Sequence, residues 1–523
     1  MDIRFYNTLH HKLDTFATTA ETTPPDKTLF GTTCRIYSCG PTVYDYAHIG
    51  NFRAFVFADV LCRYLELCGA EVLQVMNMTD VGHMTEDDRA DGGGQDKLAL
   101  AVEKMKASKK AGQAPVDNPG DPFQVADYFA RAFLDDARAM RLRVLQRYDA
   151  AAEADREKIM PRPTRHISEF IKMIEALIAQ GHAYVGSDGV VYYDINSFPE
   201  YGRLSGNSID RLSHGAGGRT AQQAAKRHPA DFFLWKPDSN HIMRWPSPWG
   251  EGYPGWHIEC SAMAMDILGS TLDIHTGGED NIFPHHECEI AQSQACSGKP
   301  FARFWMHTRH LMVDGEKMSK SKGNFYTIRD LIQQGYDPLA IRYALLATRY
   351  RESMNFSLSA LRDAAVAVES LRDLAQRSGQ RIDAQQPGIP ESPVIQKPET
   401  DTLRDFVAEL GNDLNMAGAL GRLFAWSAEV GRMKQIPADR APSINSLLQK
   451  VDRVLDVIFA PLHPLSSETV LKIDALMQDR SAARRNKDFA RSDQLRSEIE
   501  SLGAQVHDSP SGSTWRRRLA PAK

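Results

Sequence analysis

The chain has no long apolar run, no signal peptide and no cysteine pattern of a disulfide framework. In its 523 residues no stretch approaches the roughly 18 apolar residues that span a bilayer. Residues 1–9 lack the cationic and long apolar regions of a secretory signal. Seven cysteines, an odd number without regular spacing, favour a reducing compartment over disulfide bonds. We therefore expect a cytoplasmic protein with no membrane partner.

An excess of basic residues is also missing. The formal net charge of −5 argues against a uniformly basic nucleic-acid coat, although a local basic surface remains compatible with it. Apolar residues make up 42% and charged residues 25% of the chain, which is typical of globular proteins. Because the chain is too long for one ordinary core, we expect about three or four domains or subdomains.

The segment 33–78 reads as a β-α-β unit. Residues 33–38 have the composition of a strand, apolar residues then recur with helical spacing up to Gly69, and residues 71–78 form a second strand. Between the first strand and the helix lie Cys39, a soft metal ligand, and His48-Ile49-Gly50-Asn51. The unpaired amides at the start of such a helix predict a phosphate site.

The rest of the pattern alternates between α/β and helical regions. Segment 86–121, rich in glycine and lysine, is either a flexible insertion or a short helix flanked by loops, and its lysines are most often a solvated face in such runs. We expect a hairpin over 183–195, strands over 272–276 and 304–313, and a helix over 284–297. Further helices are expected over 331–349, 358–374, 402–434 and 444–459, and the C-terminal module reads as two helical segments and a tail.

A second phosphate-type loop, Lys317-Met318-Ser319-Lys320-Ser321, lies about 270 residues after the first. Its two ammonium groups suit charge that develops in phosphoryl or nucleotidyl transfer. This pair of loops resembles the signature of class I aminoacyl-tRNA synthetases. Longer segments at 37–51, 254–263 (P-G-W-H-I-E-C-S-A-M) and 283–293 (F-P-H-H-E-C-E-I-A-Q-S) resemble cysteinyl-tRNA synthetases. The resemblance extends from the N-terminal residues to Trp515, and segment 86–121 interrupts it.

The resemblance implies a Rossmann-like α/β catalytic domain with an inserted connective subdomain, followed by an α-helical bundle and a small anticodon-binding module. Its expected parts are residues 1–140 and 231–330 for the two catalytic halves and 141–230 for the insert. The helical region would begin at 331–379, continue through a proline-rich linker at 380–400 and a tRNA-binding bundle at 401–465, and end in the module 466–523. No dimerisation element is evident, so a monomer is expected.

Metal ligation can be argued from the residue types and is assigned by the resemblance. Cys39 and Cys260 are soft ligands, and His285 and Glu289 are four apart, so they share one face of a predicted helix. The resemblance implies one zinc ion on these four residues, with His257, His286 and Glu287 as alternatives that the sequence leaves open. Four protein ligands plus substrate would make the ion five-coordinate, which is less usual than three ligands and an open position.

Zinc would give the enzyme its selectivity for cysteine. A thiol and a hydroxyl are nearly isosteric, so a pocket of van der Waals contacts separates them by only a few kcal/mol, whereas zinc binds a thiolate strongly. The implied reaction joins L-cysteine to tRNA(Cys) through a cysteinyl-adenylate made from Mg-ATP. The implied site residues are, for catalysis, His48, Asn51, Lys317 and Lys320; for ATP, also Gly50, Asp280 and Ser319; for the amino acid, Thr79, Trp256 and His275.

One departure from the family pattern lies in the first phosphate loop. The commoner family form has histidine at the position of Asn51, whose amide can still donate to phosphate but carries no charge.

At the C-terminus, residues 479–523 hold ten Lys or Arg against six acids, and Phe489 and Trp515 are available for base stacking. The alternative functions are a cysteine-activating ligase that acts on an amino sugar and a non-catalytic RNA-binding paralogue. The C-terminal module argues against a ligase that acts on an amino sugar, and the intact lysine loop argues against a non-catalytic paralogue.

Overall fold

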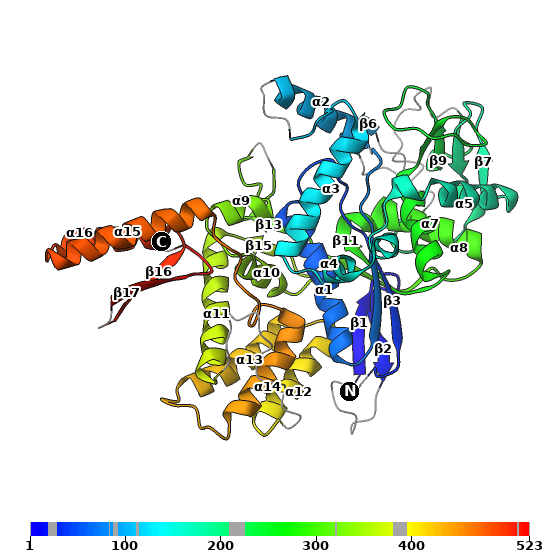
Figure 1. The fold of residues 1–523 in the computed structure, drawn as a ribbon. Coiled ribbons are helices and arrows are strands. Elements are labelled where there is room, and N and C mark those ends of the chain that lie inside the picture. Colours follow the sequence, from blue (N-terminus) through cyan, green and yellow to red (C-terminus); the bar gives the residue numbers. More distant parts are fainter. Residues whose placement is uncertain are drawn as a thin grey trace.

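The computed structural model describes residues 2–18, 29–82, 84–86, 93–110, 115–208, 225–319, 322–379, 395–509 and 512–521, and Figure 1 shows their arrangement. Its centre is a four-stranded sheet in the order β12-β11-β3-β4, formed by Ala302–Thr308, Leu272–Gly278, Thr33–Ser38 and Glu71–Met76. All three pairings are parallel, for example Tyr37 beside Val75 and His275. This confirms the expected Rossmann-like α/β fold.

Parallel pairing brings the carboxyl ends of the four strands to one edge of the sheet. The segments that follow Ser38, Met76, Gly278 and Thr308 therefore start side by side. The first crossover helix, α1 (Ile49–Leu67), is buried on nearly all sides because it packs against β4, β11 and β12 and also against helices of the C-terminal region. Its apolar residues surround the whole helix, as expected for a helix inside a core.

The strands β1 (Asp2–Asn7) and β2 (Lys12–Thr18) form a hairpin beside β12. The segment 86–121 contains a helix, α2 (Lys97–Lys110), which follows a small hairpin of β5 (Met84–Glu86) and β6 (Gly93–Asp96). The structure thus has the short helix that was one of the two expectations for this segment. Helices α3 (Pro122–Ala139) and α4 (Arg143–Ala150) follow, and the carboxylate of Asp121 caps α3.

A second, antiparallel sheet has the order β10-β9-β8-β7, from Gly252–Pro254, Phe232–Pro237, Val191–Tyr193 and Ala183–Val185, and carries α5 (Ile167–Ala179). Because β9 and β10 belong to this sheet, the insert extends beyond residue 230, where the sequence analysis ended it. The expected hairpin over 183–195 is present as β7 and β8. Helix α5 packs against α7 (Trp256–Leu268) and α8 (Glu287–Ser297). One apolar cluster with Phe170, Phe232 and Ala291 spans all three layers, so the insert supports the two helices that follow.

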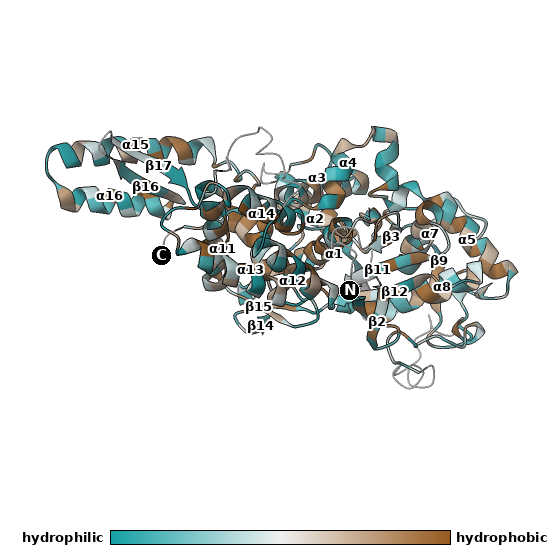
Figure 2. Cartoon of the chain, turned by 90° about the horizontal axis from the view of Figure 1, so that it is seen from below, coloured by the Kyte–Doolittle hydropathy of each residue, from teal (hydrophilic) through white to brown (hydrophobic). Residues whose placement is uncertain are grey.

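The C-terminal half begins with the short strands β13 (Leu311–Val313), β14 (Glu316–Lys317) and β15 (Met354–Phe356) and helices α9 (Ile328–Gln333) and α10 (Pro338–Leu346). It continues with α11 (Leu358–Arg377), α12 (Glu399–Gly411), α13 (Met416–Gly431) and α14 (Ala441–Leu455). An arm of α15 (Ser467–Arg485), α16 (Phe489–Ser501), β16 (Ala504–Ser509) and β17 (Gly512–Arg517) ends the chain. Figure 2 shows the mostly hydrophilic arm projecting from the rest. Phe489 is 65% exposed on it.

Several expected elements prove to be split. The strand 304–313 is β12 and β13, with Arg309 and His310 between them. Helix 331–349 is α9 and α10, because Gly335 has φ of 89° and Asp337 caps a new helix that starts with Pro338. Helix 402–434 is α12 and α13, interrupted where Asp413 and Leu414 adopt positive φ.

The remaining corrections concern ends and missed strands. Helix 444–459 ends at Leu455, where Asp456 has φ of 51°. The helix predicted from Pro284 starts regularly only at Glu287, after an irregular turn that includes extended Phe283. Strand β15 was missed, and the C-terminal tail is an antiparallel hairpin. In the described part of the chain, no helix is both long and apolar enough to cross a membrane.

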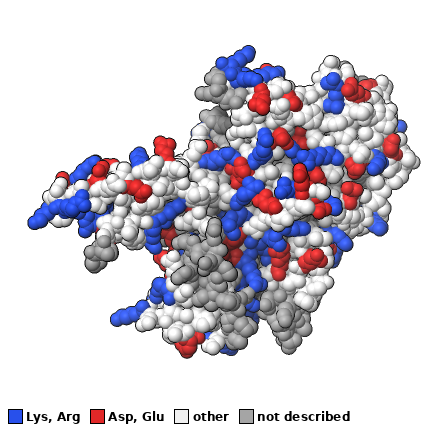
Figure 3. All heavy atoms as spheres, viewed as in Figure 1, with Lys and Arg blue, Asp and Glu red and all other residues white. Residues whose placement is uncertain are grey.

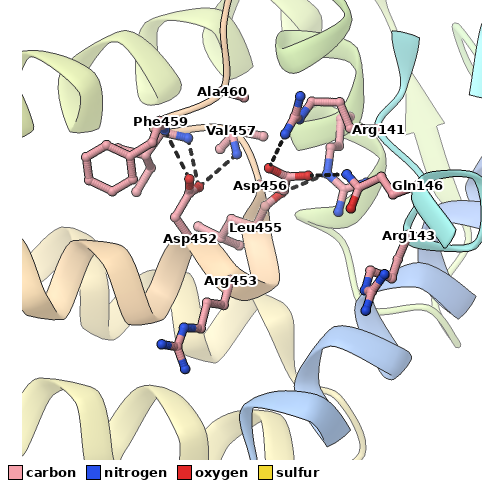
Figure 4. Close-up of polar contacts among 12 residues, drawn as sticks. Arg141, Arg143, Gln146, Asp452, Arg453, Leu455, Asp456, Val457, Phe459 and Ala460 are labelled. Carbon is pink, nitrogen blue, oxygen red and sulfur yellow. Dashed lines mark hydrogen bonds and ion pairs between the residues drawn. The ribbon is translucent and has the colours of Figure 1, made fainter. Parts of the chain in front are cut away.

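An ionic junction joins the end of α14 to α1 and to the turn between α3 and α4 (Figure 4). Asp456 accepts from Arg63 Nη2 at 2.8 Å and from Arg141 Nη2 at 2.9 Å. One turn earlier, Asp452 accepts the backbone N–H groups of residues 457 and 458 at 2.8 Å and of residue 459 at 3.0 Å. The end of α14 is thereby fixed against α1 and the α3–α4 turn.

Candidate active site and metal centre

The two predicted phosphate loops meet at the carboxyl edge of the sheet. Ile49 N–H donates to the carbonyl oxygen of Tyr326 at 3.0 Å, and His48 forms an isolated bridge with Thr327. A Cβ atom on Gly50 would lie 2.8 Å from Met318 Cε, so only glycine allows this approach without a shift. The structure therefore brings His48, Gly50 and the segment after Lys317 together. Lys320 lies outside the described residues.

His48 and Asn51 form a reciprocal cap at the start of α1. Asn51 N–H donates to His48 Nδ1 at 3.2 Å, and His48 N–H donates to Asn51 Oδ1 at 3.1 Å. An accepting Nδ1 places the proton of the neutral imidazole on Nε2. Asn51 thus has a structural role that the sequence did not reveal, and its amide group is still a donor at a helix end that favours anions.

The second loop is held in shape by contacts between the Asn324 side chain and the loop backbone. Ser319 N–H donates to Asn324 Oδ1 at 2.8 Å, and Asn324 Nδ2 donates to the carbonyl oxygen of Lys317 at 3.3 Å. Lys317 itself is exposed on β14. Asp280 is exposed in a short turn, Glu279–Asn281, directly after β11. Met318, between Lys317 and Ser319, is the residue through which this loop approaches Gly50 at the start of α1.

A second group of side chains lies in the sheet edge beside these loops. Ligand atoms of Cys39, Cys260, His285 and Glu289 all lie within 4.8 Å of one another. Cys39 follows β3, Cys260 is on α7, His285 precedes α8 and Glu289 is in its first turn. His285 Nε2 is 2.9 Å from Glu289 Oε1, and Cys39 Sγ is 3.9 Å from the same oxygen. The sequence-predicted metal ligands are therefore brought together.

The electrostatics of this cluster favour a cation. A hydrogen bond from Cys39, together with His285, lowers the pKa of the Cys260 thiol to about 6 despite its burial. Burial acts to lower the pKa of His285, but Glu289 and Cys260 outweigh it and raise that pKa to about 10. Burial likewise opposes ionisation of Glu289, whose pKa the two histidines His275 and His285 hold at about 2. Two sulfurs, an imidazole and a carboxylate in one buried site fit zinc.

The alternative ligands are not equally placed. A second set, Cys39, His275, His286 and Glu289, is equally compact, and His286 Nε2 is 3.1 Å from Cys39 Sγ. His257 Nδ1 contacts His285 Nδ1 at 3.0 Å and so fixes that ring. Glu287 points away, because its Oε2 accepts Ser205 N–H at 2.8 Å. The first set has two sulfur donors and the second only one, which favours the first for zinc.

The predicted amino-acid residues have different surroundings. Trp256, the first residue of α7, stacks on His285 at 4.3 Å between centroids. Thr79 Oγ1 accepts from Asn77 Nδ2 at 2.8 Å. His275 is fully buried, donates from Nε2 to Glu289 Oε2 at 2.8 Å and stacks on Trp305. Histidines that hold a metal-binding carboxylate in this way orient the ligand.

Sequence reasoning missed the polar residues that hold the two loops. Arg53, 2% exposed in the first turns of α1, donates to backbone carbonyl oxygens of His310, Arg349 and Glu352. Glu279 accepts from His310 N–H and from Arg309, each at 2.6 Å. Glu279 could have been noticed in the sequence because it lies beside Asp280. Arg53 could not, since a buried arginine in an apolar helix has no characteristic spacing.

Two family models match separate parts of the chain. The model of the tRNA synthetases class I (C) catalytic domain matches residues 27–366. The model of the cysteinyl-tRNA ligase anticodon binding domain matches residues 467–516. A "Cysteine--tRNA ligase" of Salinibacter ruber is 38% identical, with 98% of each chain covered. Another of Chlorobaculum tepidum is 40% identical over 95% of this chain and 98% of that protein.

Solved structures support the fold. Mycobacterium tuberculosis methionyl-tRNA synthetase bound by methionyl-adenylate superposes with a TM-score of 0.51 at 12% identity, covering 84% of this chain and 94% of that one. The likeness at this low identity concerns the fold. The family rests on the full-length relatives and on the two matched domain models. The chain belongs to the cysteine–tRNA ligase family of class I tRNA synthetases.

Proposed function

We propose that the chain ligates L-cysteine to tRNA(Cys) through a cysteinyl-adenylate. The observation that carries this proposal is that the compact cluster Cys39, Cys260, His285 and Glu289 lies at the same carboxyl edge of the sheet from which the helix that starts after His48 departs. A sulfur-binding centre next to a nucleotide-binding helix end suits activation of cysteine. Both groups of residues are reached from one edge of the sheet.

The nucleotide binds at the start of α1 in this proposal. The helix amides and the side chains of His48 and Asn51 hold the phosphates on one side, and Gly50 permits their close approach. Lys317, Ser319 and Lys320 approach from the opposite loop, and Asp280 holds the ribose. Mg²⁺ accompanies ATP. Donors on both sides of the α-phosphate stabilise the charge that develops as pyrophosphate leaves.

Cysteine binds between Thr79, Trp256 and the metal cluster, and His275 acts at the same pocket, directly or through Glu289. Zn²⁺ on Cys39, Cys260, His285 and Glu289 would hold the substrate sulfur as a thiolate and so favour cysteine over serine. The substrate carboxylate attacks the α-phosphate and pyrophosphate leaves. A ribose hydroxyl of the terminal tRNA nucleotide then attacks the carbonyl carbon of the adenylate, loses its proton and forms the ester, and AMP leaves. Positioning supplies most of the catalysis, so no side-chain nucleophile is needed.

The C-terminal arm reads the anticodon and the helices α11–α14 contact the inner tRNA in this proposal. The protein acts as a cytoplasmic monomer. Aminoacylation assays with cysteine and serine, with and without a zinc chelator, test the function directly. Without chelator, we expect the chain to form cysteinyl-tRNA and little seryl-tRNA. With chelator, we expect the selectivity for cysteine over serine to be lost.

The rival functions give different results in the same assays. Cysteine-dependent ATP–pyrophosphate exchange without acylation of bulk tRNA would favour a ligase that acts on an amino sugar. Absence of exchange with every amino acid, from a folded and zinc-loaded chain, would favour a non-catalytic RNA-binding protein.

A further inference from the structure

We propose that helix α2 presents a docking surface for the phosphate backbone of the tRNA acceptor arm, an inference that rests on the proposed function. The surface consists of Lys104, Lys106, Lys109 and Lys110, and we call it the α2 lysine face. Neither the reaction described above nor the matched anticodon module uses it. The role of the surrounding segment 86–121 was open from the sequence.

The charge of α2 contrasts with that of the whole chain. The helix carries five lysines and one glutamate, in a protein of net charge −5. Lys106 pairs with Glu103 at 2.7 Å, and Lys109 Nζ donates to the backbone carbonyl of Asp117. Among the described residues, neither Lys109 nor Lys110 lies within ion-pair distance of a carboxylate. Figure 3, viewed as Figure 1, shows basic side chains gathered at the upper end of the molecule, where α2 lies, with acidic side chains beside them.

The apolar residues of α2 fix the helix beside the active site. Leu98, Ala101, Val102 and Met105 are buried in the main apolar core. Leu98 lines a small cavity together with Tyr44 and Thr79. The helix therefore packs on the segment that joins Cys39 to His48, and its orientation is set by burial.

Two lysines make contacts to that same segment. Lys97 Nζ lies 5.4 Å from the centroid of the Tyr44 ring, and Lys104 Nζ lies 3.9 Å from Asp45 Oδ2. The exposed lysines follow along the helix, where Lys104 keeps 74% of its side chain exposed. The lysine face thus extends outward from the rim of the site at which a tRNA 3′ end must arrive.

The shape of the molecule indicates which part of the tRNA passes α2. The arm of α15 and α16 projects from one side and α2 from the top, and the surface is concave between them (Figures 1 and 3). An L-shaped tRNA with its anticodon on the arm and its 3′ end in the site would bring the acceptor arm along this concave side. Duplex RNA presents mainly phosphates and ribose hydroxyls to a protein, and lysine is a suitable point charge for phosphate.

Lysines near a helix C-terminus also have a simpler explanation, since they interact favourably with the helix dipole and with water. The two explanations differ in the salt dependence of RNA binding. Each phosphate contact by a lysine releases bound counterions, so its loss lowers the slope of log Kd against log salt concentration by about 0.7 to 0.9. A solvated face leaves that slope unchanged.

The test uses the full chain with Lys104→Gln, Lys109→Gln and Lys110→Gln combined. Its matched control combines Lys12→Gln, Lys158→Gln and Lys172→Gln, whose side chains are 68%, 71% and 72% exposed on other elements. Both variants lose the same charge. Binding is measured over a series of salt concentrations with intact tRNA(Cys) and with a minihelix that contains only the acceptor and T arms.

We expect the α2 variant to bind the minihelix about 5- to 10-fold more weakly at low salt, with a salt slope smaller by about two. Cysteine-dependent ATP–pyrophosphate exchange and thermal stability should match those of the unaltered chain. Salt slopes equal to those of the control variant would overturn the proposal, and so would weaker binding of intact tRNA with unchanged binding of the minihelix. Failure of the unaltered chain to form cysteinyl-tRNA would instead refute the proposed function.

Discussion

The guanidinium of Arg53 donates to the carbonyl oxygen of His310 at 2.9 Å, and the N–H of the same His310 donates to Glu279 at 2.6 Å. His310 lies between β12 and β13, at the base of the hairpin that carries Lys317. One peptide segment thus joins α1, the turn with Asp280 and the second phosphate loop. These three elements hold the nucleotide in the proposed function, so this contact fixes their relative positions.

Replacement of Arg53 should therefore weaken the binding of ATP more than the binding of cysteine. In Arg53→Lys the charge is kept, but an ammonium group cannot reach three carbonyl oxygens as a guanidinium fork does. We expect a rise of about tenfold or more in KM for ATP in pyrophosphate exchange, with unchanged zinc content and cysteine affinity. Arg53→Met should also lower the free energy of unfolding, since each buried carbonyl left unpaired costs about 1–3 kcal/mol.

Arg131→Lys, an exposed change on α3, is the control for the Arg53 variants. If Arg53→Lys weakened ATP and cysteine binding equally and in proportion to a fall in Tm, the arginine would be structural alone.

Asn51 can be tested for its two roles separately. Asn51→Ala removes the acceptor for His48 N–H, so the free energy of unfolding should fall by about 1 kcal/mol and adenylate formation should slow. Asn51→Asp keeps an acceptor and places a favourable negative charge at the helix N-terminus, but it repels the polyphosphate. We expect Asn51→Asp to retain stability while the exchange rate falls at least about tenfold. An active Asn51→Asp enzyme would show that this side chain does not face the phosphates.

The role of His275 can be determined by measuring how its replacement changes the affinity for zinc and the KM for cysteine. Because its Nε2 donates to Glu289 and its surface is buried, His275→Ala should weaken zinc binding about 10- to 100-fold, as loss of ligand-orienting partners does. Competition with a chelator of known affinity measures this change. A higher KM for cysteine with unaltered zinc affinity would instead place His275 in contact with the substrate.

The residues of the metal cluster were assigned through the family resemblance, and the parallel sheet gives a physical reason why they lie close together. Cys39 ends a strand, and a parallel sheet brings strand ends to one edge, so its partners had to come from segments that begin at the same edge. The sequence left His286 as a rival of His285 because neighbouring residues of a helix differ only by rotation about its axis, and His257 as another because it lies in the same segment as Cys260. That choice depended on the irregular turn before α8.

Elements bounded by long-range contacts were not predictable. Strand β15 is only three residues long and exists because it pairs with β13. The break between α12 and α13 has no proline, and Asp413 holds it by accepting from Tyr6 N–H and the hydroxyl of Tyr350, far away in sequence. The ionic junction at Asp456 likewise joins residues more than 300 positions apart. Local periodicity contains none of this information.

Asp136 predicts a pH dependence of stability. It is 3% exposed on α3, and burial raises its pKa to about 6 although Arg329 of α9 lies 2.9 Å away. A raised pKa in the folded state means that folding favours the protonated acid. This contribution is complete below about pH 4, the range of an unfolded Asp, and it is lost as the pH rises through about 6. For a shift of this size it amounts to about 3 kcal/mol.

Asp136→Asn imitates the protonated acid and removes this titration. Between pH 4 and pH 7 the Tm of the unaltered chain should therefore fall relative to that of Asp136→Asn, as measured by thermal unfolding in matched buffers. A constant difference in Tm across that range would contradict the assignment. Asp155→Asn, whose side chain is 55% exposed in the turn Glu153–Lys158, serves as the control.

The junction at Asp456 should decide how firmly the helical region is held to the sheet. Asp456→Ala leaves Arg63 and Arg141 without one carboxylate in a buried setting, so we expect a loss of about 3–5 kcal/mol. Asp456→Asn keeps an acceptor and a residue type that tolerates φ of 51°, and it should cost less. Asp456→Gly relieves the backbone conformation but removes the acceptor, so it should resemble alanine if the ion pairs dominate. Thermal unfolding and hydrogen exchange of α14 distinguish these outcomes, and equal stability of the alanine and asparagine variants would show that the charge contributes little.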